Sequence, residues 1–211
     1  MVELPNTPVD DVVEQIARSK RIDAWLYNSS NGVKAARTPR IIMSASSYQL
    51  AMDHHRAIIR LVEEDMWGSA LALLRPCVEA YTWGAWLHYC AKDKHLDLIL
   101  AHRFTRNLDG MQRDLDKIQF FETSIAKDTE GMRRNLHGFT HGGILHMQWR
   151  FKDGEVRPGY PPEVVADGLR LADVHGYLAL QGVIALAEDN AKANELHGQV
   201  YDMFGWQRPA T

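Results

Sequence analysis

The sequence predicts an all-α protein, an up-and-down bundle of helices with one small β-hairpin inserted. Apolar residues recur with the 3.6-residue period of a helix over most of the 211 residues. The connections between the periodic stretches are short, which favours antiparallel neighbours. A single stretch, residues 148–160, has the composition of paired strands. We expect one domain over residues 1–211, because the sequence contains no repeat, low-complexity segment or long linker.

Three helices are expected in the first half of the chain. Residues 10–27 carry apolar side chains at helical offsets, and residues 28–38, rich in asparagine and serine, are expected to form a loop. A long helix should follow over residues 39–66, with a proline in its first turn. The stretch 67–91 is apolar on more than one face, which predicts a helix at the centre of the bundle.

The second half of the chain is expected to contain further helices and the hairpin. Periodicity indicates short helices over residues 96–106 and 108–121, then a helix over residues 129–141. An Asp-Gly pair inside the stretch 148–160 predicts a tight turn between two short strands. After two prolines, a long helix is expected over about residues 162–190.

The charge of the chain excludes a global basic field for nucleic acid. The formal net charge is -3, so RNA or DNA binding would need a local patch. The best candidate patch is diluted by neighbouring aspartates, and a solvated face of mixed charge is its commoner explanation. The residues of this patch are Arg103, Arg106, Arg113, Lys117, Arg133 and Arg134.

We expect a cytoplasmic protein with no membrane span. The beginning of the sequence lacks the basic region and apolar run of a signal peptide. Arg75 and Glu79 interrupt the most apolar stretch, residues 69–90, and a membrane span would carry them only at considerable cost. Cys77 and Cys90 have the spacing of neither a metal pair nor a disulfide framework, so both are expected to be core thiols.

The segment from Met132 to Gly143 holds the densest set of groups able to handle a proton or a phosphate. On a helix, Arg134, His137 and His141 stand at i, i+3 and i+7 and share one stripe. The Gly-Gly pair that follows His141 fits the end of that helix, because glycine takes the left-handed conformation of a C-terminal cap. The two histidines should therefore lie near an exposed helix end.

Two of three interpretations of this segment involve no nucleic acid. In the first, the histidines satisfy local hydrogen bonds and complement the helix dipole. In the second, His137 and His141 share a metal ion, which would need a third protein ligand. The candidates for that ligand are His54, His55, Glu79 and His146, and the chain has no His-Glu-x-x-His motif. This is the weaker functional option, so no metal or cofactor is expected.

The third interpretation is metal-independent cleavage of RNA. A histidine would move a proton to or from the 2′-hydroxyl or the leaving oxygen, while an arginine would hold the phosphate. Arg134 and His141 have these capacities. Seven residues span about 10 Å along a helix axis, so a phosphate would have to bridge two turns or two subunits. A dimer interface would resolve that geometry.

These residues resemble the HEPN superfamily. Arg134-Asn135, with His141 six residues further on, is similar to its pattern of arginine, polar residue and histidine, and residues 69–80 and the Phe-Thr-His-Gly-Gly ending look like uncharacterised bacterial members. The resemblance covers about residues 40–190. It implies a dimeric helical bundle, in many members a ribonuclease toxin or phage-defence effector, with an antitoxin or other protein as a further partner. Arg134 and His141 would be the catalytic pair and Asn135 a helper, and other members are inactive scaffold domains.

The sequence contains two further groups of charged residues and histidines that bear on this prediction. Arg75 and Glu79, four residues apart on an apolar helix, are expected either to pair structurally or to place Arg75 in the cleft beside His141. With Arg133 and His137 they complete the expected substrate-binding set. His54 and His55 point about 100° apart on a helix, and a solvated face is expected for them.

Overall fold

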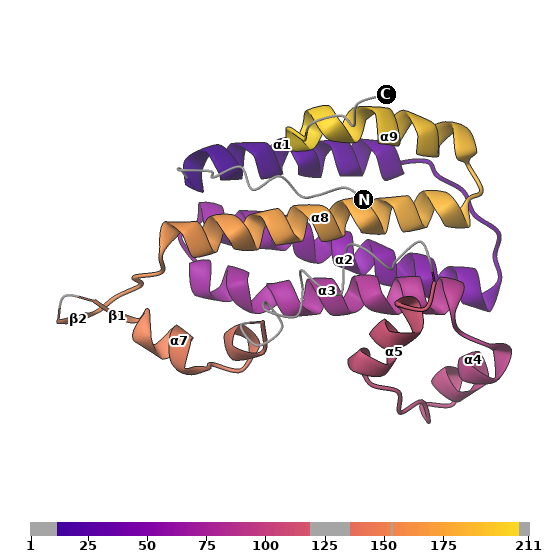
Figure 1. Ribbon diagram of the computed structural model, residues 1–211, viewed down its shortest axis with the longest axis horizontal. Coiled ribbons are helices and arrows are strands. Elements are labelled where there is room, and N and C mark those ends of the chain that lie inside the picture. Colours follow the sequence, from indigo (N-terminus) through magenta and orange to yellow (C-terminus); the bar gives the residue numbers. More distant parts are fainter. Residues whose placement is uncertain (1–11, 119–135, 153, 207–211) are drawn as a thin grey trace.

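Four long helices form the body of the protein in the computed structural model, which describes residues 12–118, 136–152 and 154–206 (Figure 1). The central helices α2 and α3 pack against each other and against α8, and α8 also contacts α1. A shorter helix, α9, lies on α1 and α8. This arrangement confirms the all-α bundle. The bounds are α1 Val12–Ser30, α2 Pro39–Glu63, α3 Trp67–Tyr89, α8 Pro162–Leu186 and α9 Asn190–Phe204.

The first two helices end differently from the sequence expectation. Residues 28–30 belong to α1 rather than to the loop, because Ser29 is buried and the Ser30 hydroxyl donates a hydrogen bond to the Tyr27 carbonyl. The Thr38 side chain caps α2 by accepting from the Ile41 amide at 3.3 Å. At its other end α2 stops at Glu63. Asp65, two residues beyond the end of α2, has a left-handed backbone (φ 56°).

Helix α3 is buried on several faces, as predicted for a central helix. Its buried positions include Leu71, Leu74 and Trp86, and the Trp86 side chain is fully enclosed. Trp86 also donates from its indole nitrogen to Asp114 at 3.0 Å. Trp86 therefore anchors the packing of α3 in the interior.

Two short helices, α4 (Asp93–Leu100) and α5 (Leu108–Leu115), follow α3. The expected helix 96–106 was wrong at both ends, since it begins earlier and stops before His102, which has a positive φ of 54°. Asn107 then starts α5, because its side chain accepts from the Gly110 amide at 2.9 Å. The helix ends at Leu115 and residues 116–118 form a turn, so the expected continuation toward residue 121 was wrong. Residues 119–121 lie outside the described residues.

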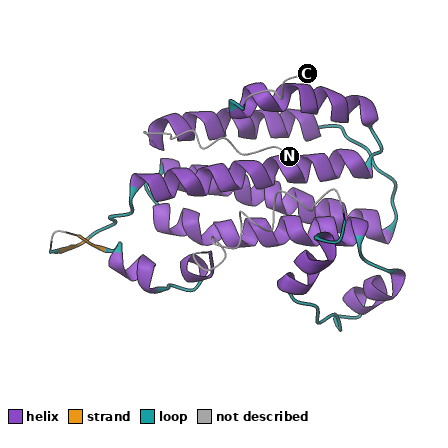
Figure 2. Cartoon of the chain, viewed as in Figure 1, coloured by secondary structure: helices purple, strands orange, loops and turns teal. Residues whose placement is uncertain are grey.

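The segment that carries the histidines is described from residue 136. Residues 136–140 are helical and Gly142 has the expected left-handed backbone (φ 66°), whereas residues 129–135 of the predicted helix lie outside the described residues. A short helix that was not predicted, α7 (Ile144–Gln148), precedes the hairpin. The two strands of the hairpin pair antiparallel and project beyond the helices (Figure 2). They are β1 Phe151–Lys152 and β2 Glu155–Val156.

The end of the chain holds one more helix than the sequence predicted. Helix α8 begins at Pro162 as expected but stops at Leu186, and Glu188 follows with a positive φ of 55°. Asp189 then caps α9 by accepting from the Lys192 amide at 2.9 Å. Glycine 205, in the left-handed conformation (φ 68°), ends α9.

The apolar core runs along the bundle in two parts. One lies between α1, the first half of α2, the second half of α3, α4, α5, α9 and the second half of α8. The other lies between the end of α2, the first half of α3, residues 136–139 and the first half of α8. None of the helices in the described part of the chain combines the length and apolar character that crossing a bilayer requires.

Candidate functional site

Arg75, on the first half of α3, is the centre of the candidate site. Its Nε donates to Glu79 Oε1 at 2.6 Å, one helical turn further on. The two side chains are 30% and 35% exposed, so solvent reaches both charges. The expected pair is therefore present, but it lies on the surface of the bundle rather than in its interior.

Both histidines of the predicted stripe face this guanidinium. Arg75 Nη1 lies 2.6 Å from His137 Nδ1 and 3.4 Å from His141 Nε2. The two imidazole ring centroids are 4.5 Å apart, and both histidines are exposed. We call Arg75, Glu79, His137 and His141 the Arg75 cluster. Arg75 thus pairs with Glu79 and also projects beside His141, so the contacts of both expected arrangements are present.

The contacts of Arg75 indicate which ring nitrogen of each histidine accepts a hydrogen bond. Arginine only donates hydrogen bonds, so His137 Nδ1 must be the acceptor of the short contact. In the neutral ring the proton of His137 then lies on Nε2, where it can be donated outwards. His141 Nε2 likewise presents a lone pair toward Arg75. One cation and two imidazoles, each with one accepting and one donating ring nitrogen in its neutral form, therefore meet at one exposed place.

Packing below the cluster holds the histidine segment against α3. Leu136 and Phe139 are buried, so the opposite side of this turn presents His137 to solvent. The Thr140 hydroxyl lies 3.3 Å from the Ala72 carbonyl, on α3 one turn before Arg75. His146 Nε2 donates to the Phe139 carbonyl at 2.7 Å, which ties the end of the helical turn to α7.

The remaining predicted site residues are not part of the Arg75 cluster. Arg133, Arg134 and Asn135 lie outside the described residues, so the expected pairing of Arg134 with His141 stays a prediction.

Over the described ranges, no three histidine, cysteine, aspartate or glutamate side chains are grouped to hold a metal ion. The third ligands considered for a metal are engaged elsewhere: His55 with Asp173, Glu79 with Arg75, and His146 with Tyr160 and Phe139. His54 does not enter such a group either.

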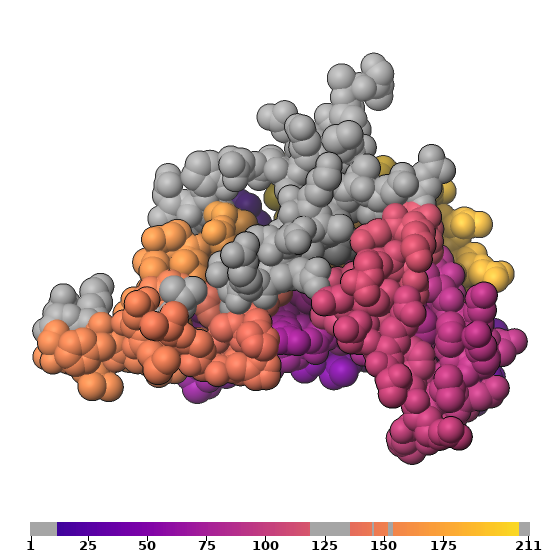
Figure 3. Space-filling view, turned by 60° about the horizontal axis from the view of Figure 1, so that its bottom comes forward, coloured from indigo at the N-terminus to yellow at the C-terminus, as the bar shows by residue number. Residues whose placement is uncertain are grey.

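The basic residues around α5 form a face of mixed charge. Asp114 lies 2.6 Å from Arg106 and 3.3 Å from Lys117, so one carboxylate offsets two of the expected cations. The α4–α5 segment and the segment after residue 136 lie at opposite ends of one face (Figure 3). For the described residues of this patch, the solvated mixed-charge interpretation therefore fits better than a nucleic-acid surface does.

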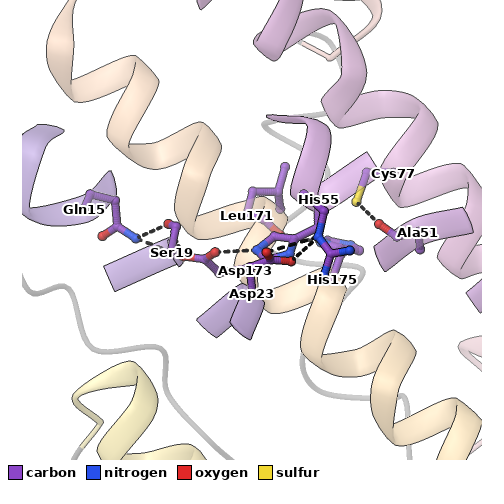
Figure 4. A network of polar contacts seen from close by, with 10 residues as sticks. Gln15, Ser19, Asp23, Ala51, His55, Cys77, Leu171, Asp173 and His175 are labelled. Carbon is purple, nitrogen blue, oxygen red and sulfur yellow. Dashed lines mark hydrogen bonds and ion pairs between the residues drawn. The ribbon is translucent and has the colours of Figure 1, made fainter. Parts of the chain in front are cut away.

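A second polar constellation, which the sequence interpretation missed, lies in the interior. His55 was expected on a solvated face, but it is fully buried, with Nε2 2.7 Å from Asp173 Oδ1. Asp173 Oδ2 accepts from Ser19 Oγ at 2.7 Å and from Gln15 Nε2 at 2.9 Å. Figure 4 shows Asp173 with these partners, which come from α1 and α2. The carboxylate, not the histidine, is the central group.

This arrangement is structural rather than catalytic. In a hydrolytic triad the histidine stands between the hydroxyl and the carboxylate, whereas here Asp173 stands between Ser19 and His55. All three residues are at most 1% exposed, so no substrate reaches them. The sequence contained a signal for this network, because Gln15 and Ser19 lie on the same side of α1 as Ile22. Polar side chains on that buried side need hydrogen-bond partners inside the bundle.

The fold and the Arg75 cluster together define an all-α bundle with an exposed arginine–histidine site. The model of a family of unknown function, DUF6988, matches residues 48–205, and the chain belongs to that family. The match includes the whole Arg75 cluster and excludes α1. No curated protein and no solved structure matches the chain.

Proposed function

We propose that this protein is HEPN-like and cleaves RNA, without a metal ion, at the Arg75 cluster. The observation that carries the proposal is the position of Arg75 Nη1, 2.6 Å from His137 Nδ1 and 3.4 Å from His141 Nε2 on an exposed surface. A phosphate contacting the guanidinium would lie beside both imidazoles. Arginine suits this role because its planar fork matches two phosphate oxygens.

The cluster contains the groups that transesterification of RNA requires. The 2′-oxygen attacks the adjacent phosphorus, a 2′-oxygen–phosphorus bond forms, and the bond from phosphorus to the 5′-oxygen breaks. The His141 lone pair would take the 2′-hydroxyl proton, and the outward N–H of His137 would supply a proton to the leaving 5′-oxygen. Arg75 would stabilise the charge that develops on the phosphate oxygens.

The HEPN resemblance adds a second subunit to this proposal. In a homodimer, Arg134 and Asn135 would complete the shared cleft with His141. Sedimentation equilibrium tests the assembly separately from the chemistry. A monomer at all micromolar concentrations would remove the shared cleft, while cleavage by the Arg75 cluster alone would still be open to test.

An RNA-cleavage assay in excess EDTA tests the activity. Purified protein without a histidine tag is incubated with a mixed pool of single-stranded and structured RNA, and products are checked for 2′,3′-cyclic phosphate ends. His141→Ala should lower the rate roughly 10²- to 10⁴-fold, the range of a lost general acid or base. His197→Ala, an exposed histidine on α9, is the matched control and should retain full activity. Circular dichroism confirms that each variant folds.

Substitution of Arg75 separates phosphate binding from proton transfer. Arg75→Lys keeps the charge but loses the fork, and should lower kcat more than it raises KM, because the lost contact acts on the transition state. Arg37→Lys, in the exposed loop before α2, is the matched control for the exchange of an arginine for a lysine. Intact RNA after prolonged incubation with wild type in EDTA would contradict the enzymatic proposal.

A non-catalytic HEPN-like interaction module is the second candidate, and one observation favours it. Arg75 and His137 bond directly at 2.6 Å, and with the Thr140–Ala72 contact they hold the histidine segment on α3. In this case the cluster only holds the bundle together. A double-mutant cycle of Arg75→Ala and His137→Ala would then give a clear coupling in unfolding free energy while wild type leaves RNA whole.

A further inference from the structure

A pocket of about 490 Å³ lies at the other end of the bundle from the start of α3. It is lined by residues from α2, the end of α3, the end of α8 and the start of α9. Tyr89, on its wall, lies fourteen residues beyond Arg75, roughly 21 Å along the helix axis. The volume is that of a site for a small molecule. This pocket is therefore separate from the Arg75 cluster and independent of the proposed nuclease function.

Three tyrosines contribute polar groups to this pocket: Tyr48, Tyr81 and Tyr89. Tyr48 and Tyr81 are only 1% and 4% exposed, and their rings lie 6.1 Å apart. A buried tyrosine hydroxyl normally has a hydrogen-bond partner. Within the described residues neither of these two hydroxyls makes a hydrogen bond to protein, although both side chains line the pocket. Their polar ends are thus available to a molecule inside it.

Two glycines fix the Tyr48 ring in this position. A Cβ atom at Gly84 would lie 2.6 Å from Tyr48 Cδ1, and one at Gly182 would lie 2.3 Å from Tyr48 Cζ. The ring is therefore held between α3 and α8 by close backbone approach on both sides. Because the ring cannot move aside, the wall that it forms is preorganised.

The charges at the pocket are all negative. Burial, followed by the neighbouring phenols, raises the pKa of Tyr48, and burial raises that of Tyr81, so both hydroxyls stay neutral. Glu188 and Asp189 lie at the pocket, and both are exposed. No lysine, arginine or histidine is among its described lining residues. An anionic ligand would therefore meet two carboxylates without a compensating cation.

We propose that this pocket binds a small organic cation, an ammonium group carried on an apolar or aromatic body. The oxygens of the tyrosine hydroxyls accept hydrogen bonds from an ammonium group. Gln181 offers its amide oxygen in addition, since its Nε2 donates to Tyr177. Glu188 supplies the counter-charge, while Asp189 is partly occupied by the Lys192 amide.

Isothermal titration at pH 7.5 with three probes of matched shape tests the charge preference. The probes are phenethylammonium, phenylethanol and phenylacetate, which are cationic, neutral and anionic. The cation should bind with a dissociation constant below about 10 mM, a modest demand for so small a probe. It should bind at least several-fold more tightly than the alcohol, and the acid should not bind. Equal affinities for all three, or no binding of the cation at about 10 mM, would overturn the proposal.

Variants of the full chain locate the binding. Glu188→Gln should weaken phenethylammonium binding roughly three- to tenfold, and Tyr81→Phe should weaken it while keeping the ring. Glu64→Gln removes another exposed carboxylate, which follows the last residue of α2, and should leave binding unchanged. If both Glu188→Gln and Tyr81→Phe bind the cation as wild type does, the cation binds elsewhere and the proposed site is wrong.

Discussion

His55 Nε2 lies 2.7 Å from Asp173 Oδ1 in the interior, where the side chains of the two residues are 0% and 2% exposed. The contact joins α2 to α8, and the other carboxylate oxygen joins α8 to α1 through Ser19 and Gln15. A buried carboxylate is tolerated only when its oxygens are satisfied in this way. Asp173 is therefore the residue on which the relative placement of three helices depends.

Asp173→Asn should destabilise the fold by about 3–5 kcal/mol. The substitution removes the charge that faces His55 and places an amide where the carboxylate accepted from two donors. Urea unfolding followed by circular dichroism gives the free energy. Asp167→Asn, an exposed carboxylate on the same helix paired with Arg170, should change stability by less than about 1 kcal/mol. Similar losses in both variants would contradict a special role for Asp173.

Stability should fall as the pH drops from 7 to 5, and His175 should contribute to the slope. Burial lowers the pKa of His175, while its bond to the Leu171 carbonyl acts in the opposite direction. Below about pH 6.5 the unfolded chain takes up a proton that the folded ring resists, so acid favours unfolding. One such group contributes at most about 1.4 kcal/mol per pH unit.

Comparison with His175→Asn isolates this group from other histidines, because burial also lowers the pKa of His146 and His88. Asparagine can keep the bond to the Leu171 carbonyl but does not titrate. Unfolding free energies measured between pH 5 and 7.5 should show a shallower dependence for the variant. Parallel curves for variant and wild type would show that His175 does not take up the proton.

Gly182→Ala should destabilise the protein by about 1–3 kcal/mol. The new Cβ would lie 2.3 Å from the Tyr48 ring, which Gly84 holds from the other side, so the core would be overpacked. Gly198→Ala is the matched control, because a Cβ there meets nothing within 4 Å. In the helix α9 it should stabilise by up to about 1 kcal/mol. Thermal unfolding of both variants checks the opposite signs.

The two cysteines should differ in reactivity toward an aromatic disulfide reagent at pH 8. Burial raises the pKa of Cys77 to about 12 and that of Cys90 to about 11, so neither forms much thiolate, which is the reactive species. Cys77 is also enclosed and donates to the Ala51 carbonyl. Cys90, half-buried, should react slowly in the native protein, and Cys77 only on unfolding. Rapid reaction of two thiols without denaturant would contradict this.

The helical architecture was predictable because it rests on local periodicity. The apolar positions of α2, α3 and α8 repeat every three or four residues, and prolines mark the starts of α2 and α8. Helix α9 was missed because it follows α8 after a short turn whose Glu188 has a positive φ. A non-glycine residue in that conformation gives no clear stop signal in the sequence.

The candidate site was predictable in part for the same reason. His137 and His141 share a stripe by helical spacing, and Arg75 and Glu79 pair by it. The contact of His137 and His141 with Arg75 depends on tertiary packing, because His137 lies 62 residues from Arg75 in the sequence. The burial of His55 was missed because its partner Asp173 is 118 residues away. Sequence spacing gives the face of a helix but not what lies opposite it.

The family match begins at residue 48, within α2, whereas the interior of the protein begins with α1. Of the five buried positions on α1, three are polar: Gln15, Ser19 and Ser29. This helix therefore docks by orientation-dependent bonds as much as by apolar area. A polypeptide shortened to residues 48–205 would lack Gln15 and Ser19, which donate hydrogen bonds to Asp173. It would also expose to solvent the apolar side of α8 that packs against α1. The family match thus begins inside the packed helical bundle rather than at its edge.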